Sequence, residues 1–230
     1  ITLGYQHRGV ERALVEGPAA RRMPMIETLA GDTTVGHALA HCELVEALNG
    51  VEAPLRAQAI RGISLELERL ANHTGDLGAL ANDVAFLPTA AYCGRLRGDL
   101  LNLTALLCGN RFGRGLLCPG GVMFDLDADR VAELDRRLEK TAAEVANAVE
   151  LLWTTSSVLA RFEETGVVSA ATARELGLVG VAARACGLER DVRFDYASGI
   201  YRFAQVPVSS WPSGDVFARA YVRWLEVQRS

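Results

Sequence analysis

Apolar residues recur every three or four positions along most of the chain, which is the spacing of one face of a helix. Residues 34–48 show this pattern first, with Thr33 or Thr34 as the cap and Asn49-Gly50 as a left-handed stop. Pro54 suits the first position of a second helix. The apolar stripe of this second helix consists of Ile60, Ile63, Leu67, Leu70, Thr74 and Leu77.

A third helix is predicted to begin at Pro88 and to end at Gly109-Asn110. It contains Gly94 and Gly98, which weaken a helix but allow a neighbouring helix to come close. A fourth and longer helix is predicted over residues 129–159, where apolar residues keep a near-heptad spacing. The second, third and fourth predicted helices would form most of a helical bundle.

The remaining residues carry weaker signals. Ser169 is predicted to cap a short helix that stops at Gly177. Residues 180–211 are rich in glycine and are predicted to form loop with a short strand near residues 205–208. A last helix is predicted from Gly214-Asp215 to the end of the chain, with one side formed by Phe217, Tyr221 and Trp224.

These elements predict a mainly α fold, a helical bundle with long helices and a small β/loop region. The sequence contains no internal repeat and no low-complexity linker, so one domain is expected over residues 1–230. The chain begins with isoleucine, and its last helix has no stop signal. We therefore expect a fragment of a longer protein, truncated at both ends.

The composition supports a globular protein and narrows its partners. Half of the residues are apolar and the net charge is −4, which argues against disorder and against nucleic acid as the main partner. No apolar run reaches 18 residues, so no membrane span is expected. The five scattered cysteines contain no C-x-x-C pair and are expected to be core residues. Lys140 is the only lysine among 24 basic residues, and the arginines are suited to buried ion pairs.

A row of polar residues lies beside the apolar stripe of the second predicted helix. Its members are Glu66, Arg69, His73, Asp76 and Asp83, which share about a third of the helix circumference. An acid, a base and an imidazole in one row could relay protons. The alternative is a helix edge whose charges pair with one another and with neighbouring groups. The sequence leaves both interpretations open.

The residues before the first predicted helix allow two interpretations as well. The backbone N–H groups of residues 31–34 would lie at the positive end of the helix dipole, where an anion or a carbonyl oxygen could bind. Asp32 and the threonines also fit as simple helix caps. His37 and His41 lie four residues apart, but no third ligand accompanies them, so they are a weak metal signal. Pro119-Gly120-Gly121 indicates a tight turn.

Several short motifs in sequence order resemble one known family. Arg8-Gly9-Val10-Glu11, sixteen further residues, Thr28 to Thr33 and then His37 resemble the first signature of the nickel–iron hydrogenase large subunit. Other blocks resemble the related large subunit of respiratory complex I, which lines the quinone site. These blocks begin at Leu3, Arg56, Glu68, Pro119, Gly166 and Gly214, so the resemblance covers nearly the whole chain. The stretches 72–76 and 82–86 resemble membrane-bound, formate-hydrogenlyase-like hydrogenases most.

The resemblance also shows a departure that changes the expected chemistry. The two nickel-binding cysteines of the first signature fall at Ala30 and Thr33. A methyl group cannot bind nickel, and a neutral hydroxyl is a poor substitute for a soft thiolate. We therefore expect no nickel–iron site and no cofactor in this chain. The family's second cysteine pair lies beyond Ser230.

The same resemblance implies a cavity that accepts a quinone or relays protons. Its lining would be Ala30, Gly31, Asp32 and Thr33, with His37 behind the loop. The candidate proton carriers are Asp83, His73 and Glu11. Asp83 aligns with an aspartate near the family's quinone pocket, and a different alignment would nominate Asp76 instead.

The leading hypothesis is therefore a subunit of a complex I-like or hydrogenase-like oxidoreductase complex, with NADH/quinone or formate-hydrogenlyase type electron transfer. Iron–sulfur clusters would lie in a partner subunit, and the protein would be cytoplasmic and peripheral to the inner membrane through its partners. The isolated chain is expected to be inactive. The rival hypothesis is a non-catalytic structural or assembly paralogue that docks an iron–sulfur partner. A third hypothesis is an active hydrogenase with stoichiometric nickel.

Overall fold

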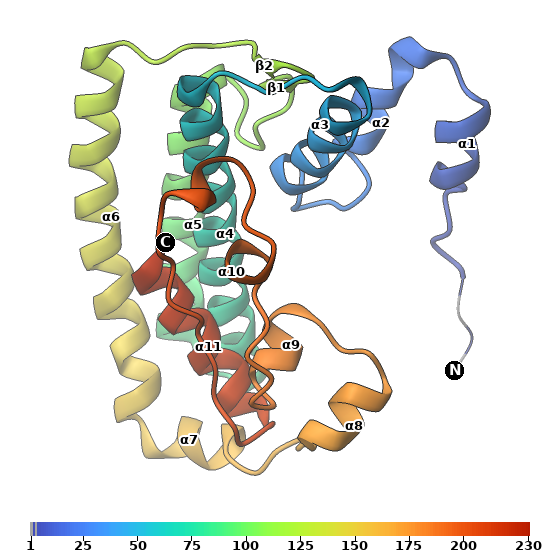
Figure 1. The fold of residues 1–230 in the computed structure, drawn as a ribbon. Helices are drawn as coiled ribbons and strands as arrows, with labels where there is room; N and C mark the ends of the chain where they lie inside the picture. The colour runs from blue at the N-terminus through green and yellow to red at the C-terminus, as the bar shows by residue number, and fades with distance from the viewer. Residues whose placement is uncertain (1, 3) are drawn as a thin grey trace.

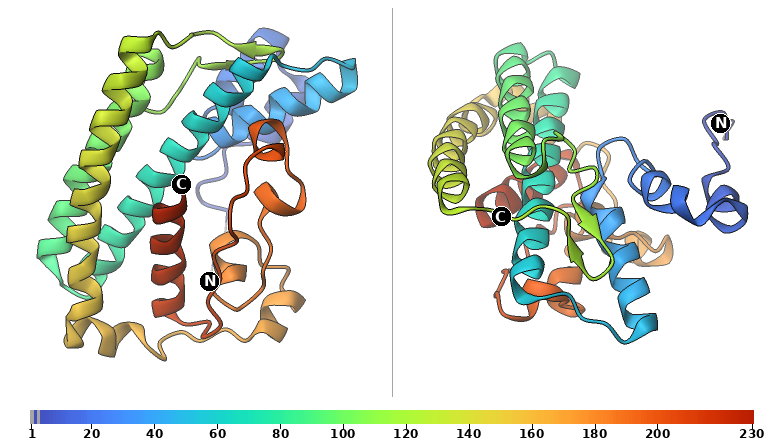
Figure 2. Two further views of the ribbon diagram at one scale, coloured as in Figure 1. Left: turned by 60° about the vertical axis from the view of Figure 1, so that its left-hand side comes forward. Right: turned by 90° about the horizontal axis from the view of Figure 1, so that it is seen from above.

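The computed structural model describes residue 2 and residues 4–230, and it shows a mainly helical protein (Figure 1). Three long helices and the last helix form a bundle: α4 (Leu55–Asp83), α5 (Leu87–Cys108), α6 (Ala128–Thr154) and α11 (Val216–Arg229). The short connection between α4 and α5 makes them an antiparallel pair at its centre. Helix α6 packs against α5, and α11 packs against α4 (Figure 2). The predicted fold class is confirmed.

Shorter elements surround this bundle. Before it come α1 (Val10–Glu16), η1 (Ala19–Arg21), α2 (Arg22–Ile26) and α3 (Val35–Asn49). A two-stranded antiparallel hairpin, β1 (Leu117–Cys118) and β2 (Gly121–Val122), lies between α5 and α6. After α6 come α7 (Ser156–Phe162), α8 (Ala170–Glu175), α9 (Gly180–Arg184), α10 (Val192–Asp195) and η2 (Gly199–Arg202).

Buried leucines of α4 and α5 form the centre of the core. One cluster joins α3, α4, α5 and the hairpin, and a second joins the far ends of α4 and α5 to α6, α7 and α11. Cys42, Cys93 and Cys186 are buried in these and neighbouring clusters as small apolar residues, as predicted, whereas Cys108 and Cys118 are only half-buried. No helix in the described part of the chain is both long enough and apolar enough to cross a membrane.

The close contact between α4 and α5 lies at different glycines from those predicted. A Cβ atom at Gly78 would lie 2.8 Å from the Cβ of Cys93, and one at Gly75 would lie 2.7 Å from Cδ of Arg97. A Cβ atom at Gly94 would meet nothing within 4 Å. The glycines of α4, and not Gly94 and Gly98, let the two helices approach. Periodicity alone did not reveal which face of α5 turns toward its partner.

Two further predictions need correction. The helix predicted over residues 129–159 is two helices, because Thr155 adopts an extended conformation (φ −98°, ψ 106°) between α6 and α7. Residues 180–211 contain short helices instead of a strand, and both strands of the described chain flank Pro119-Gly120. The turn predicted at Pro119-Gly120-Gly121 therefore closes a hairpin, with Gly120 at φ +87°.

Candidate functional site

A cluster of buried charged side chains lies where α4, α9 and α11 meet. Glu226 of α11 is fully buried, and its carboxylate accepts hydrogen bonds from His73 Nε2 at 2.6 Å and from Arg69 at 3.5 Å. Arg184 of α9 is also buried and donates to the other carboxylate oxygen of Glu226. One acidic side chain thus binds two arginines and a histidine away from solvent.

The cluster continues from α4 toward α10 and η2. Glu66 accepts from Arg69 at 3.1 Å, from Arg193 at 3.2 Å and from the hydroxyl of Tyr201 at 2.5 Å. Asp191 accepts from Arg193 at 2.7 Å. The negative charges of Glu66, Asp191 and Glu226 are therefore balanced by the positive charges of three arginines. We call this group the Glu226 network, and its members are Glu66, Arg69, His73, Arg184, Asp191, Arg193, Tyr201 and Glu226.

Mutual interactions fix the charge states of the network. Burial opposes ionisation of Glu226, but the hydrogen bond from His73 and the charges of Arg184 and Arg69 outweigh it and lower its pKa from 4.5 to about 2. Burial lowers the pKa of His73 below 6.5, despite its contact with Glu226. His73 is therefore a neutral imidazole at neutral pH, and it donates its Nε2–H to an ionised carboxylate.

The row predicted on the second helix is a paired helix edge from Glu66 to Asp76. Asp76 accepts from Nε of Arg223 on α11 at 2.8 Å, which completes the series of ion pairs between α4 and α11. Asp83 takes no part in this series of ion pairs. This residue is exposed at the last position of α4, about 15 Å along the helix axis from His73.

The N-terminus of α3 does receive an anion, but the anion is a side chain of the protein itself. Glu68 of α4 accepts from the backbone N–H groups of Thr34 at 2.7 Å, Val35 at 2.7 Å and Gly36 at 3.0 Å. The predicted side-chain cap is absent, since the hydroxyl of Thr34 donates to the carbonyl of Glu27. Glu68 replaces the cap because α4 passes directly beside the start of α3.

The loop over residues 28–34 is held by residues from three other parts of the chain. Arg8 donates to the carbonyls of Thr28 at 2.6 Å and Leu29 at 2.8 Å. Asn72 of α4 donates to the carbonyl of Asp32 at 3.0 Å, and Arg97 of α5 pairs with its carboxylate at 3.1 Å. Motifs that are far apart in the sequence therefore converge on this loop.

The predicted cavity residues lie together on this loop, at the surface of the described chain. Ala30 and Thr33 are half-buried, whereas Gly31 and Asp32 are exposed. His37 is half-buried in the first turns of α3. In the part of the chain that the structure describes, no three His, Cys, Asp or Glu side chains form a group that could hold a metal ion.

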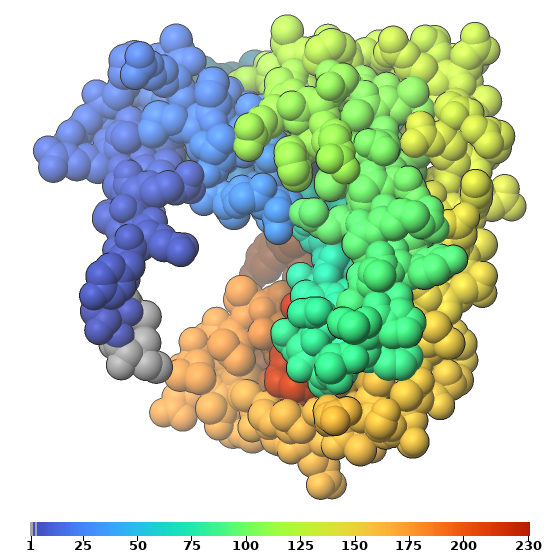
Figure 3. Space-filling view, turned by 180° about the vertical axis from the view of Figure 1, so that it is seen from behind, coloured from blue at the N-terminus to red at the C-terminus, as the bar shows by residue number. Residues whose placement is uncertain are grey.

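Glu11 lies apart from the other candidate proton carriers. It is exposed on α1, a helix that has no buried residues. Seen from behind, an open gap lies between the dark blue part of the chain and the orange and green parts (Figure 3). The structure thus places His73, Asp83 and Glu11 in three separate environments, of which only that of His73 is buried.

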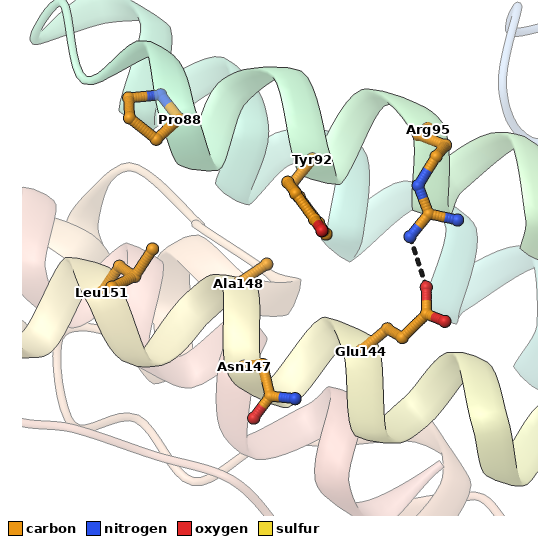
Figure 4. A pocket seen from close by; sticks show the side chains of 7 residues that line it. All are labelled: Pro88, Tyr92, Arg95, Glu144, Asn147, Ala148 and Leu151. Carbon is orange, nitrogen blue, oxygen red and sulfur yellow. Dashed lines mark hydrogen bonds and ion pairs between the residues drawn. The ribbon is translucent and has the colours of Figure 1, made fainter.

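A groove between α5 and α6 has a volume of about 620 Å³ and contains none of the predicted residues (Figure 4). Its walls are formed by Pro88 and Tyr92 of α5 and Leu151 of α6, and the ion pair between Arg95 and Glu144 lies at one end. None of the residues that line the groove belongs to the loop over residues 28–34 or to the Glu226 network.

Glu68→Gln is expected to lower the free energy of unfolding by about 1–2 kcal/mol, because three backbone N–H groups lose a charged acceptor. Urea denaturation followed by circular dichroism measures this loss. The matched control is Glu139→Gln on the exposed face of α6, which should change the unfolding free energy by less than about 0.5 kcal/mol. Equal effects of the two substitutions would contradict the capping role of Glu68.

Comparison with known proteins agrees with the family that the sequence motifs resemble. Residues 83–230 match the family described as "Respiratory-chain NADH dehydrogenase, 49 Kd subunit". The chain belongs to this family. The matched segment contains α5 to α11, including Arg184, Asp191, Arg193 and Glu226 of the Glu226 network.

Curated relatives of the 49-kDa subunit family align over nearly the whole chain. It is 30% identical over 234 residues to a carbon monoxide-induced hydrogenase of Rhodospirillum rubrum, covering 100% of this chain and 64% of that protein. It is 30% identical over 228 residues to an NADH-quinone oxidoreductase subunit of Solibacter usitatus, covering 99% and 62%. The corresponding NADH-quinone oxidoreductase subunit of Campylobacter jejuni is 31% identical, with 99% and 56% covered. The chain thus spans less than two thirds of the length of these relatives.

Sequence reasoning missed most of the Glu226 network in this 49-kDa subunit homologue. Glu66, Arg69 and His73 were found because they share one helix face, whereas Arg184 and Arg193 lie in short segments with little periodic signal. Glu226 lies on the predicted last helix, but periodicity does not show which helix it contacts. The excess of arginine over lysine was the available signal, and the buried ion pairs of Arg61, Arg184 and Arg193 agree with it.

Proposed function

We propose that this protein is a subunit of a complex I-like or hydrogenase-like oxidoreductase complex and works without nickel. Membership of the 49-kDa subunit family supports the complex, since relatives are named as subunits of NADH-quinone oxidoreductase and as a hydrogenase. The observation that carries the proposal is the loop over residues 28–34. The loop is anchored by Arg8, Asn72 and Arg97, and Glu68 anchors the start of the helix that follows it. Ala30 and Thr33 of the loop provide no soft metal ligand.

The donor set of this loop does not fit nickel. Nickel in a hydrogenase-type site requires soft thiolates, and the side chains at the corresponding positions are a methyl group and a neutral hydroxyl. His37 is the nearest predicted ligand, and it lies four residues beyond Thr33 on α3. The mechanism we propose therefore includes no step at nickel in this loop.

The proposed substrate of the loop is a quinone, whose reduction takes up two electrons and two protons. Electrons would come from iron–sulfur clusters of a partner subunit, and this chain would supply the pocket and the protons. Asp83 and Glu11 are exposed carboxylates that can exchange protons with water. His73 is a neutral buried base that can accept one. We further propose that the complex lies at the cytoplasmic side of the inner membrane and that partner subunits attach this chain to it.

Asp83→Asn is expected to lower quinone-dependent electron transfer of the assembled complex at least about tenfold, because an amide cannot carry a proton. The measurement is the turnover of the purified complex, with subunit content checked on the same preparation. The matched control is Asp99→Asn, which removes a partly exposed carboxylate from α5 and should leave turnover unchanged.

Wild-type turnover of the intact Asp83→Asn complex would remove Asp83 from the mechanism. Loss of turnover in Asp76→Asn, with wild-type turnover in Asp83→Asn, would assign the proton-carrying role to Asp76. Stoichiometric nickel in the purified complex would contradict the nickel-free proposal and support an active hydrogenase.

A second candidate is a non-catalytic paralogue that docks an iron–sulfur partner. The paired helix edge from Glu66 to Asp76 favours it, because these side chains already satisfy one another and stabilise the fold. In this case Asp32→Asn and Thr33→Ala would leave the turnover of the complex unchanged, while substitutions on the docking surface would abolish partner binding. Loss of turnover in the loop variants, with the complex assembled, would reject this candidate.

A further inference from the structure

His73 is bound through only one of its two ring nitrogens. Nε2 lies 2.6 Å from the carboxylate of Glu226, while Nδ1 is buried and has no hydrogen-bond partner among the described residues. The ring as a whole is more than nine-tenths buried. One nitrogen therefore has a strong charged partner, and the other keeps a free lone pair or an unpaired proton.

The carboxylate of Glu226 has no freedom to change this arrangement. Its Oε2 binds His73 and Arg69, and its Oε1 binds Arg184. An ionised carboxylate is an acceptor only, so the ring nitrogen that faces it must carry the hydrogen. A neutral His73 can then have no hydrogen on Nδ1.

We propose that Glu226 is a positioning residue that holds His73 in the Nε2–H tautomer and thereby makes Nδ1 the atom that accepts a proton. This inference rests on the proposed function, in which His73 is one of the proton carriers. A carboxylate that orients an imidazole in this way also stabilises the imidazolium that forms when the proton arrives. The proton binds to the Nδ1 lone pair, and the bond between Nε2 and its hydrogen is retained.

Charged side chains lie on the elements packed around His73. The charges of Arg69 and Arg223 oppose a positive ring, and the carboxylate of Glu226 favours it. Besides Glu226, α11 contributes Arg223, which pairs with Asp76 of α4. Arg69 of α4 and Arg184 of α9 both contact Glu226, and Arg97 of α5 pairs with Asp32. Beyond Arg69, Glu66 binds Arg193 of α10 and Tyr201 of η2. Glu226 is the acidic group in direct contact with His73, so it is the group that can hold the added positive charge.

A purely structural histidine would be expected to bond through both nitrogens. Leaving a buried acceptor unpaired lowers stability, and native structures contain few such groups. The free Nδ1 is thus better explained by a role that requires the lone pair. Lowering of the pKa of His73 by burial is consistent with this role, because it keeps the ring neutral until a proton is delivered.

The test is nitrogen NMR of the full chain with ¹⁵N-labelled histidine, which is practical because the sequence contains only four histidines. His73→Gln identifies the signals of His73. We expect a single neutral tautomer in the wild-type protein at pH 7, with the hydrogen on Nε2. In Glu226→Gln we expect this preference to be lost, because an amide can either accept from Nε2–H or donate to a bare Nε2.

The matched control is Asp76→Asn, which removes a carboxylate from the same contact between α4 and α11 but leaves the bond to His73 in place. It should keep the wild-type tautomer. A hydrogen on Nδ1, or a charged ring at pH 7, in the wild-type protein would overturn the proposal even if Glu226→Gln fails to fold. An unchanged tautomer in folded Glu226→Gln would overturn it as well. These spectra do not depend on electron transfer, so failure of the proposed function leaves them unaffected.

Discussion

Glu226→Ala is expected to lower the free energy of unfolding by about 3–5 kcal/mol, a loss typical of a broken buried ion pair. The substitution removes the acid that neutralises Arg69 and Arg184, and Arg184 is then a buried charge without a partner. It also leaves the Nε2–H of His73 without an acceptor. Urea denaturation measures the loss, and the melting temperature should fall by roughly 10 °C.

The control for Glu226→Ala is Asp76→Ala, which breaks an ion pair between the same two helices. The carboxylate of Asp76 is half exposed, so water screens and replaces its interaction with Arg223. Its removal should therefore lower the free energy of unfolding by about 1 kcal/mol or less. If Glu226→Ala loses no more free energy of unfolding than Asp76→Ala, the Glu226 network does not stabilise the fold.

Arg61→Ala is expected to have a comparable effect, about 3–5 kcal/mol of unfolding free energy. Arg61 of α4 is buried and donates to both carboxylate oxygens of Glu46 on α3, at 2.6 and 3.1 Å. It also donates to the carbonyls of Cys118 at 2.8 Å and Gly121 at 2.9 Å in the hairpin. One side chain thus joins α3, α4 and the hairpin, and its loss leaves a buried carboxylate unpaired.

A double variant separates the lost pair from the unpaired charge. In Arg61→Met with Glu46→Leu, neither of these two positions keeps a buried charge, so most of the stability lost in Arg61→Ala should return. Recovery should stay incomplete, since the N–H of Gly120 also donates to Glu46. The matched control, Arg56→Ala, removes an exposed pair with Asp125 and should cost less than about 1 kcal/mol. A double variant less stable than Arg61→Ala would contradict this account.

The long helices could be predicted because a repeating apolar face carries its signal over many residues. Helices α3, α5 and α11 begin and end within about two residues of their predicted limits, and α4 begins one residue after Pro54. The boundary between α6 and α7 was missed, since Thr155 is neither glycine nor proline and its extended conformation follows from the packing of both helices. Short helices such as α9 and α10 have too few residues to show a period, and their contacts with α4 and α11 hold them.

The amino-acid sequence by itself determined the helical fold class, the apolar faces, the family to which the chain belongs, and the methyl and hydroxyl groups at residues 30 and 33. The tertiary structure decided which charges meet. Only the packing of α11 against α4 brings Glu226 to His73, and only the passage of α4 beside α3 brings Glu68 to three backbone N–H groups. Helical periodicity is a local property of the chain, whereas the hydrogen bond between His73 and Glu226 joins residues more than 150 positions apart.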